Sequence, residues 1–362
     1  MQTITVQLPG GTTYPILIGY GVRERIGPLL EELEIARRYV VVTDAHVADL
    51  HGRRLIEELT GCGLPVEMIF FPAGEASKTI DTALAIVRQL VAAGADRKTA
   101  LIALGGGVVG DVTGLVASLY MRSLPYVQIP TSLVAQVDSS IGGKTAIDLP
   151  EGKNLLGTFY QPRAVLTDPA FLTALPEAEF VNGLAEVVKY GAIDQGDLFT
   201  LLEDEMAALK LLHSDVLTRV IERCCTIKKL LVEEDEKDQG PRRFLNFGHT
   251  LGHALEAASD YALAHGSGVA LGMVAAARLS EKIGGLPGRD QERIERMISN
   301  AGLPSAIPAQ MSTDVIMSKL RADKKKSGAV INFVLLKKLG VPFVTGEVGE
   351  ALLRETIEGL KR

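Results

Sequence analysis

The chain has 362 residues, of which 47% are hydrophobic and 23% are charged, and its formal net charge is −6. This composition excludes a disordered chain, because enough apolar surface is available to offset the entropy of ordering. The chain is net acidic, lacks Trp, and only 5% of its residues are aromatic, which disfavours nucleic acid as the main partner.

The cysteine content and the first residues of the chain indicate the cellular compartment in which the protein is expected. Cys62, Cys224 and Cys225 are an odd number and two are adjacent, which disfavours a disulfide framework and favours a reducing compartment. The opening MQTITVQLPGG reads as a strand and a turn rather than a signal peptide. No uncharged apolar stretch reaches the roughly 18 residues of a membrane span. We therefore expect a cytoplasmic protein that does not enter a membrane.

Short β-branched runs alternate with helical spacing in the first half of the chain. We expect strands over residues 39–44, 66–71, 100–104 and 126–130, with helices between them, as over 82–93. Continuous apolar strands that alternate with helices predict a Rossmann-like parallel sheet covered on both faces, in an α/β N-terminal domain.

After about residue 169 the pattern becomes mainly helical. Helices are expected over residues 180–190, 215–234, 245–258 and 269–283, and the one convincing late strand is 331–336. The sequence therefore predicts an α/β domain over residues 1–175 and a mostly α-helical domain over 176–362.

A glycine-rich turn follows the third predicted strand. Gly105, Gly106, Gly107 and Gly110 satisfy G-x-G-x-x-G between a strand and a helix, which predicts a dinucleotide pyrophosphate at the helix N-terminus. The alternative is a tight strand–helix turn without a ligand. No acidic residue follows about 20 residues later, as a standard Rossmann domain requires. Asp44 could serve instead, although taken alone it favours a helix N-cap.

Three of the six histidines fall close together in the second half. His249 and His253 are four residues apart, so on a helix they share a face, and His265 follows. Two imidazoles and a carboxylate would suit zinc, and Glu186, a charge among apolar residues, is the candidate third ligand. This spacing nominates His249 and His253 as the ligand pair. The alternatives are ordinary hydrogen-bonded histidines and an intrahelical salt bridge between Glu186 and Lys189.

Cations gather near glycines and hydroxyls. The segment 138–145 ends in Gly-Gly-Lys-Thr, which lacks the earlier glycine of a Walker loop, and Gly-Lys-Asn follows at 152–154. Lysines beside glycine turns suit a phosphate or carboxylate of a small substrate. Further cations, many of which could be solvated surface charges, are Arg122, Lys228, Arg242 and the run Lys324–Lys326.

Together these strings resemble the 3-dehydroquinate synthase family. The matching strings, in chain order, are GGGVVGD at 105–111, IPTSLVAQVDSSIGGKT at 129–145, GKN at 152–154, FYQP at 159–162, GLAEVVKYG at 183–191 and LNFGHTLGHALE at 245–256. The resemblance implies a two-domain enzyme, a homodimer, that uses NAD and a divalent metal, normally zinc, with cobalt as an alternative.

The resemblance also implies roles for individual residues. It assigns the metal to Glu186, His249 and His265, and makes His253 an acid/base residue rather than a ligand. The implied cofactor-binding residues are Asp44, Glu75, Lys78, Gly105, Gly106, Gly107, Asp111, Thr131, Ser132, Lys153 and the segment Phe171, Leu172, Thr173 and Ala174. The implied substrate-binding residues are Arg122, Asp138, Lys144, Asn154, Lys189, Lys228, Arg242, Asn246 and either Lys324 or Lys325, with Arg122 reaching the neighbouring subunit's site.

The implied reaction converts 3-deoxy-D-arabino-heptulosonate 7-phosphate to 3-dehydroquinate and phosphate. It runs through transient oxidation by NAD, phosphate β-elimination, reduction, ring opening and an intramolecular aldol step. The sequence departs from the family at Ser132, where a second Thr is frequent, at Ser123, where Gly is usual, and at Asp238, where a Glu is the proposed acid/base residue. The alternatives are a metal-dependent polyol or glycerol dehydrogenase of the same fold, another sugar phosphate cyclase, and a non-catalytic NAD-sensing protein.

Overall fold

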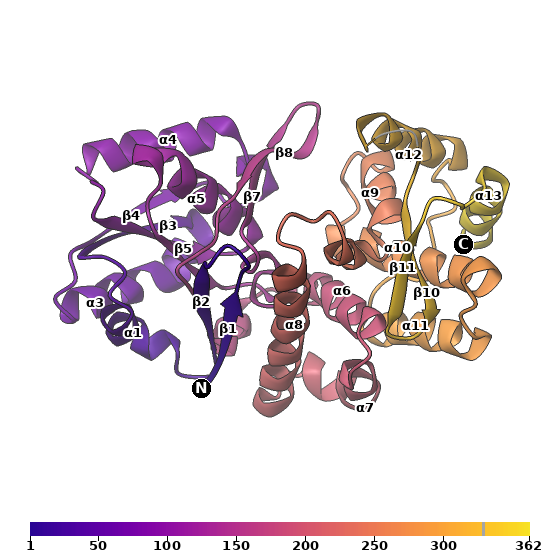
Figure 1. Cartoon of the computed structure of the whole chain (residues 1–362), viewed down its shortest axis with the longest axis horizontal. Coiled ribbons are helices and arrows are strands. Elements are labelled where there is room, and N and C mark those ends of the chain that lie inside the picture. The colour runs from indigo at the N-terminus through magenta and orange to yellow at the C-terminus, as the bar shows by residue number, and fades with distance from the viewer. Residues whose placement is uncertain (328–329) are drawn as a thin grey trace. The chain divides into compact units, whose positions relative to one another are not determined.

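The computed structural model describes residues 1–327 and 330–362, and the side chains of residues 323–327 are outside this description. The described chain forms two compact units (Figure 1). The first comprises Met1–Pro176 and Leu217–Lys237, and the second comprises Glu177–Val216 and Asp238–Arg362. Residues 217–237, which the sequence assigned to the helical domain, thus pack with the first unit. The domain boundary at residue 175 stays a prediction.

The first unit is built on a sheet with the order β1-β2-β9-β6-β5-β3-β4, of which β1 to β5 are labelled in Figure 1. Its strands are β1 (Gln2–Gln7), β2 (Thr13–Ile18), β3 (Arg38–Asp44), β4 (Val66–Phe71), β5 (Thr99–Gly105), β6 (Tyr126–Pro130) and β9 (Ala164–Thr167). Only β1 and β2 pair antiparallel, and the other neighbours are parallel. The predicted parallel-dominated α/β sheet is confirmed.

Helices cover both faces of this sheet, as continuous apolar strands require. They are α1 (Ile26–Glu32), α3 (Arg53–Gly61), α4 (Ile80–Ala92) and α5 (Gly107–Leu119). Side chains alternate along β3, so Val40 and Val42 pack with α4 and α5, whereas Tyr39 and Val41 pack with α1 and α3. Every residue of β5 and β6 is buried.

The strand order reverses beside β3. The chain passes from β3 to β4 on one side and then returns to place β5 on the other side. In open α/β sheets, ligands bind outside the carboxyl ends of the strands at such a switch point. Asp44 ends β3 and Gly105 ends β5, so both lie at this place.

A hairpin that the sequence did not predict lies in the cation-rich segment. β7 (Lys144–Leu149) and β8 (Gly152–Phe159) pair antiparallel, with an irregularity between Ile147 and Leu149. β8 is exposed or half-buried along its whole length. It therefore lacks the alternation of apolar and polar residues on which strand prediction depends.

The second unit is mainly helical, as expected, with one small hairpin (Figure 1). Its elements are α6 (Glu177–Ile193), α7 (Leu198–Lys210), α9 (His249–Ala258), α10 (His265–Leu279), α11 (Gly288–Asn300), α12 (Thr313–Ser327), β10 (Phe333–Lys338), β11 (Val341–Thr345) and α13 (Glu350–Gly359). The remaining long helix, α8 (Ser214–Glu234), begins in the second unit and continues in the first. None of the helices in the described residues is long and apolar enough to cross a membrane.

Three sequence predictions in this unit were wrong in detail. The late strand is paired with a second strand, β11. The sequence did not predict β11, because Pro342 and the flanking glycines indicate a turn. The helix predicted from residue 245 begins at His249, because Gly248 adopts φ +83° and residues 241–246 form a 3₁₀ turn. The helix predicted from residue 269 begins at His265, since Gly266 and Gly268 dilute the apolar spacing of its first turn.

Candidate active site

Three helices of the second unit bring two imidazoles and a carboxylate together. Glu186 lies within α6, His249 is the first residue of α9, and His265 is the first residue of α10. Oε1 of Glu186 is 3.4 Å from Nε2 of His249 and 3.5 Å from Nε2 of His265. The residue pair nominated by spacing, His249 and His253, does not form this group.

Close contacts between the three helices fix these positions. A Cβ at Gly272 of α10 would lie 1.8 Å from the carbonyl oxygen of Gly248, and one at Gly252 would lie 2.9 Å from that of Gly268. Gly266, next to His265, donates its N–H to Oδ1 of Asn182 in α6 at 2.5 Å. Asn182 is one helical turn before Glu186, so α6 is held directly to the start of α10.

Both imidazoles are oriented by hydrogen-bond partners at Nδ1, the ring nitrogen that does not face Glu186. Nδ1 of His249 lies 3.3 Å from the carbonyl oxygen of Phe247, and Nδ1 of His265 lies 3.0 Å from Oε1 of Glu256. Each ring therefore has a hydrogen-bond partner on Nδ1 and turns Nε2 toward Glu186. Metal-binding histidines are held in this way by carbonyls and carboxylates.

The donor atoms fit a divalent metal ion. Glu186 is 2% exposed, and its Oε1 accepts no hydrogen bond from any described residue although two imidazole nitrogens face it. A tetrahedral ion with bonds of about 2.0–2.1 Å separates its ligand atoms by about 3.3–3.4 Å. The separations of 3.4 and 3.5 Å in this structure match this value. Two imidazoles and one carboxylate leave a position open for a substrate oxygen.

A buried cation shares this group. Lys189 pairs with the second carboxylate oxygen of Glu186 and is 1% exposed. Burial opposes ionisation of Glu186, but Lys189 and His249 hold the pKa of that carboxyl well below its usual range. Burial would lower the pKa of His265, yet Glu186 and Glu256 raise it to about 10 without a metal. Glu186 and Glu256 therefore favour a positive charge beside His265, which a divalent cation could supply in place of the proton on that imidazole.

His253 lies beside this group on the exposed side. Its ring centre is 5.3 Å from that of His249 and 6.0 Å from that of His265. It forms a second group of possible donors with Glu256 and His265. An exposed imidazole next to a metal group can both accept and donate a proton near neutral pH.

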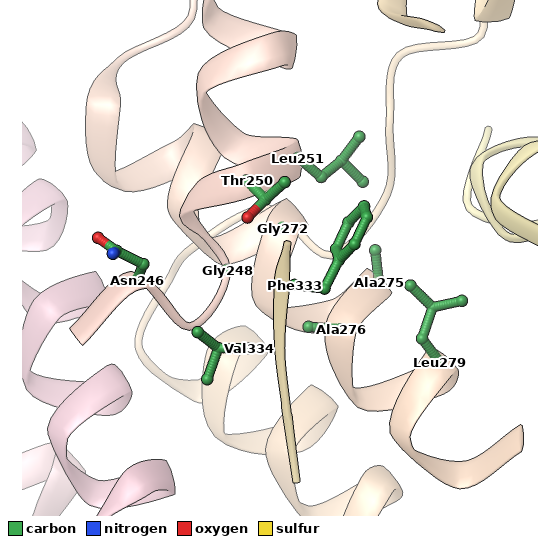
Figure 2. Close-up of a pocket in the computed structure, with 10 residues that line it drawn as sticks. All are labelled: Asn246, Gly248, Thr250, Leu251, Gly272, Ala275, Ala276, Leu279, Phe333 and Val334. Carbon is green, nitrogen blue, oxygen red and sulfur yellow. The ribbon is translucent and has the colours of Figure 1, made fainter. Parts of the chain in front are cut away.

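The other substrate candidates of the second unit lie around its 3₁₀ turn. Arg242 is 1% exposed, and Asn246 lines a cavity of about 10 Å³ with Gly248, Thr250, Phe333 and others (Figure 2). This cavity has room for one water at most and not for a sugar. Thr250 donates to the carbonyl of Asn332 at 2.9 Å, which anchors the start of α9 next to β10. The side chains of Lys324 and Lys325 lie outside the described residues.

In the first unit, the glycine turn connects β5 to α5 at the switch point. A Cβ at Gly105 would lie 2.5 Å from Cγ2 of Val109, and those at Gly106 and Gly107 would lie 3.3 and 3.2 Å from the hydroxyls of Ser132 and Ser139. The N–H of Thr131 donates to the carbonyl of Gly105 at 3.0 Å. The turn and the loop after β6 are therefore in contact, and α5 begins with amides that an anion can use.

Asp44 acts as the N-cap that its sequence context favoured. Its Oδ1 accepts from the N–H of Val47 at 3.0 Å, at the start of the short helix α2 (Ala45–Val47). The residue remains at the carboxyl end of β3, next to β5, which is where a ribose would be expected.

Five further candidates form one cluster between α5 and the β7–β8 hairpin. Lys78, which is 6% exposed, is 2.6 Å from Asp111 and donates to Oδ1 of Asn154 at 2.6 Å. Lys153 lies 3.4 Å from Glu75. Burial would lower the pKa of Lys78, but Asp111 raises it, so this ammonium stays charged. Asn154, assigned to the substrate, thus lies with residues assigned to the cofactor.

The remaining candidates of the first unit differ in exposure. Phe171 and Leu172 are buried in the core and Phe171 packs edge-on against His51, whereas Thr173 is exposed. Lys228 of α8 donates to the carbonyl of Asp138 at 2.6 Å and pairs with its carboxylate.

Lys144 is exposed, and Arg122 lies in a run of three residues with positive φ from Met121 to Ser123.

Sequence analysis missed Glu256 and Asn182. Both lie one helical turn from a nominated residue, Glu256 after His253 and Asn182 before Glu186. A polar residue at this spacing on an apolar helix face is a signal for a second layer of contacts around a site.

Comparisons with known proteins agree with these observations. The chain matches the family models described as 3-dehydroquinate synthase N-terminal, over residues 68–182, and 3-dehydroquinate synthase C-terminal, over residues 183–326. The 3-dehydroquinate synthase of Desulforamulus reducens is 45% identical over 352 residues, which are 97% of this chain and 98% of that protein.

Two solved structures are similar over nearly the whole chain. One is 2-deoxy-scyllo-inosose synthase complexed with carbaglucose-6-phosphate, NAD+ and Co2+, with a TM-score of 0.90, 27% identity, and coverage of 99% of this chain and 100% of that one. The other is 2-epi-5-epi-valiolone synthase from Streptomyces hygroscopicus with NAD+ and Zn2+, with a TM-score of 0.89, 28% identity, and coverage of 96% and 97%.

Proposed function

The chain belongs to the 3-dehydroquinate synthase family, and we propose that it converts 3-deoxy-D-arabino-heptulosonate 7-phosphate to 3-dehydroquinate and phosphate. The observation that carries the proposal is the buried oxygen of Glu186, which faces two imidazole nitrogens beside Lys189. Such a set of ligands can hold a metal ion, and the metal ion can act as a Lewis acid on a hydroxyl group of the substrate.

Glu186, His249 and His265 would hold the metal, zinc or cobalt. When bound there, the metal would polarise the hydroxyls at carbon 5 and its neighbour and ease loss of the proton from the carbon-5 hydroxyl oxygen. Lys189 keeps the Glu186 carboxylate ionised, and by the family resemblance it would also contact the substrate. His253 would carry the proton that leaves the hydroxyl, because it is exposed and lies beside both imidazole ligands.

NAD would bind at the switch point of the sheet. When bound, it would take the carbon-5 hydride and later return it, so that no NADH accumulates. The triple-glycine turn and the first amides of α5 would accept the pyrophosphate, and Asp44 would hold a ribose hydroxyl. Glu75, Lys78, Asp111, Thr131, Ser132 and Lys153 would surround the rest of the cofactor.

The task of the remaining cations is to bind the two anionic ends of the substrate. Lys144, Lys228, Arg242 and a lysine at 324 or 325, with the amides of Asn154 and Asn246, would bind phosphate and carboxylate and align the reacting carbons. The ketone at carbon 5 would acidify the proton on carbon 6, the substrate's own phosphate would accept that proton, and phosphate would then leave carbon 7. The product then forms by ring opening and aldol closure without further loss of atoms.

We further propose a cytoplasmic homodimer. Leu119 and Met121 near Arg122, and Leu155, Leu156 and Phe159 on the hairpin, are large apolar side chains exposed in the isolated chain. Exposed apolar side chains of this kind favour an interface with a second copy. No disulfide joins any of the three cysteines, all of which lie in the described residues, and this suits a reducing compartment.

The test is to incubate the zinc-loaded protein with the heptulosonate phosphate and a trace of NAD. We expect phosphate and 3-dehydroquinate in equal amounts, many per NAD, without lasting absorbance at 340 nm. Stoichiometric NADH without phosphate would indicate a dehydrogenase instead. Turnover of a different sugar phosphate, with none of the heptulosonate, would indicate another cyclase.

A further inference from the structure

One buried carboxylate next to the metal group has no role in the reaction described above. Glu256, in α9, is 2% exposed. Its Oε1 lies 3.0 Å from Nδ1 of His265, on the side of the ring opposite to the nitrogen that faces Glu186. A carboxylate is costly to bury, so its position beside one ring nitrogen demands an explanation.

The backbone around Glu256 is held firmly. Its carbonyl accepts from the N–H of Tyr261 at 2.8 Å and from the hydroxyl of Ser259 at 2.8 Å, where α9 ends. Glu256 therefore belongs to a fixed helix end, and its side chain reaches His265 from a defined place.

The first turn of α10 makes room for this carboxylate. A Cβ at Gly268 would lie 3.0 Å from Cγ and 3.3 Å from Oε1 of Glu256. The carboxylate thus lies against the N-terminal turn of α10 that also carries His265, and the positive end of a helix dipole favours a negative charge there.

We propose that Glu256 is a positioning residue, which holds the proton of His265 on Nδ1 and so leaves Nε2 available for the metal. The inference rests on the proposed metal site. A neutral imidazole carries its proton on one of its two nitrogens, and the other nitrogen is an acceptor. A carboxylate that faces Nδ1 holds the proton on Nδ1, so that Nε2 is left as the acceptor. Loss of such a partner weakens metal binding about 10- to 100-fold in other metalloproteins.

Glu256 could instead be a ligand itself, because it also lies near His253 and His265. The geometry favours positioning. Oε1 of Glu256 is at hydrogen-bond distance from the ring, whereas Oε1 of Glu186 accepts no hydrogen bond from a described residue and stands at the separation of two metal ligands.

The experiment compares Glu256→Gln, which keeps an acceptor, with Glu256→Met, which removes it at similar volume. Metal-free full-length protein is titrated with Co²⁺ against a chromophoric chelator, and the cobalt absorption bands are recorded. We expect the dissociation constant to rise about 10-fold for the Gln variant and about 100-fold for the Met variant. The control is Glu295→Gln, which removes a charge paired with Arg278 in the same unit and should leave cobalt binding unchanged.

The outcomes separate the inference from the proposed function. If both variants bound Co²⁺ as tightly as the parent protein, the positioning role of Glu256 would be refuted, and the proposed metal site would not be affected. A changed cobalt coordination number in the Gln variant would also overturn it, because Glu256 would then be a ligand. Failure of the parent protein to bind Co²⁺ would instead overturn the proposed metal site on which the inference rests.

A second variant tests the same contact from the other side. Gly268→Ala would place a methyl group 3.0 Å from Cγ and 3.3 Å from Oε1 of Glu256, and 3.1 Å from the carbonyl oxygen of Gly252, while both carboxylates stay in the protein. We expect it to weaken cobalt binding about 10-fold, as the Gln variant does, while NAD binding in the first unit is retained. Unchanged cobalt affinity would show that the position of this carboxylate does not matter.

Discussion

The two candidate sites of this protein are built in different ways. In the first unit, the glycine turn offers backbone amides, and its key residues are consecutive in the chain. In the second unit, the metal group consists of side chains from three separate helices, and glycine contacts between helices set their distances. The first site therefore depends on local backbone shape, and the second on helix packing. Substitutions should separate the two.

The largest effect is expected for His265→Ala. Removal of one of three ligands should weaken zinc binding by more than the roughly 100-fold that loss of an outer partner causes. Activity should be lost with it, whereas NAD affinity should stay within about twofold. Zinc content after dialysis and NAD titration measure both effects. His213→Ala, a histidine elsewhere in the same unit, is the control, and a His265→Ala protein that retained stoichiometric zinc would refute the ligand assignment.

Gly106→Val is expected to have the opposite selectivity, with weakened NAD binding and unchanged zinc binding. The added side chain would meet the hydroxyl of Ser132 and cover the amides at the start of α5. The dissociation constant for NAD should rise at least about tenfold, or about 1.4 kcal/mol, with zinc affinity unchanged. Isothermal titration of each ligand checks this. Gly61→Ala, which meets nothing within 4 Å, should change neither affinity. Equal loss of both would mean that the sites are not independent.

A smaller effect is expected on the reactivity of the Cys225 thiol. Its protection from labelling tests whether this part of α8 packs with the first unit. Burial raises the pKa of Cys225 to about 12, and its Sγ lies 3.3 Å from the carbonyl of Gln136. Because the folded pKa exceeds the usual value of 9.0, stability from this thiol is complete below pH 9 and is lost as the pH rises toward 12. Iodoacetamide at pH 8 should label Cys62 well before Cys225, as peptide mass spectrometry would show. Equal labelling rates in native protein would contradict the packing.

The smallest effect is expected for Ser123→Gly. Ser123 has φ +99°, in a region that favours glycine, after two other residues with positive φ. The substitution should stabilise the protein by about 1 kcal/mol, because strain in the folded state exceeds the entropy that glycine adds to the unfolded one. Urea unfolding measures the change. No gain, or a loss, would show that the serine side chain compensates for its backbone.

Features encoded by neighbouring residues could be predicted from the sequence. The strands 66–71 and 126–130 have the predicted bounds, and the glycine turn lies between strand and helix as expected. Glu186 was identifiable as a charge within an apolar helix. Features that depend on distant residues could not be derived in this way. Helical spacing favoured His253 as the second ligand. His265 was noticed in the same cluster, but it was assigned to the metal only through the family resemblance.

The reason is physical. The position of His265 follows from contacts of α10 with α6 and α9, at Gly266 and Gly272, and no local pattern encodes them. Glu256 had a local signal, one helical turn after His253, but its contact with His265 joins two helices and could not be derived from that spacing. The β7–β8 hairpin was missed because its second strand is exposed and has no apolar face.

The most direct test of the account is anomalous diffraction at the zinc edge from crystals of the zinc-loaded protein. The account predicts one peak per chain, about 2.0–2.2 Å from Oε1 of Glu186 and from Nε2 of His249 and His265. A peak bound by His253 and Glu256, or no peak within bonding distance of Glu186, would contradict it.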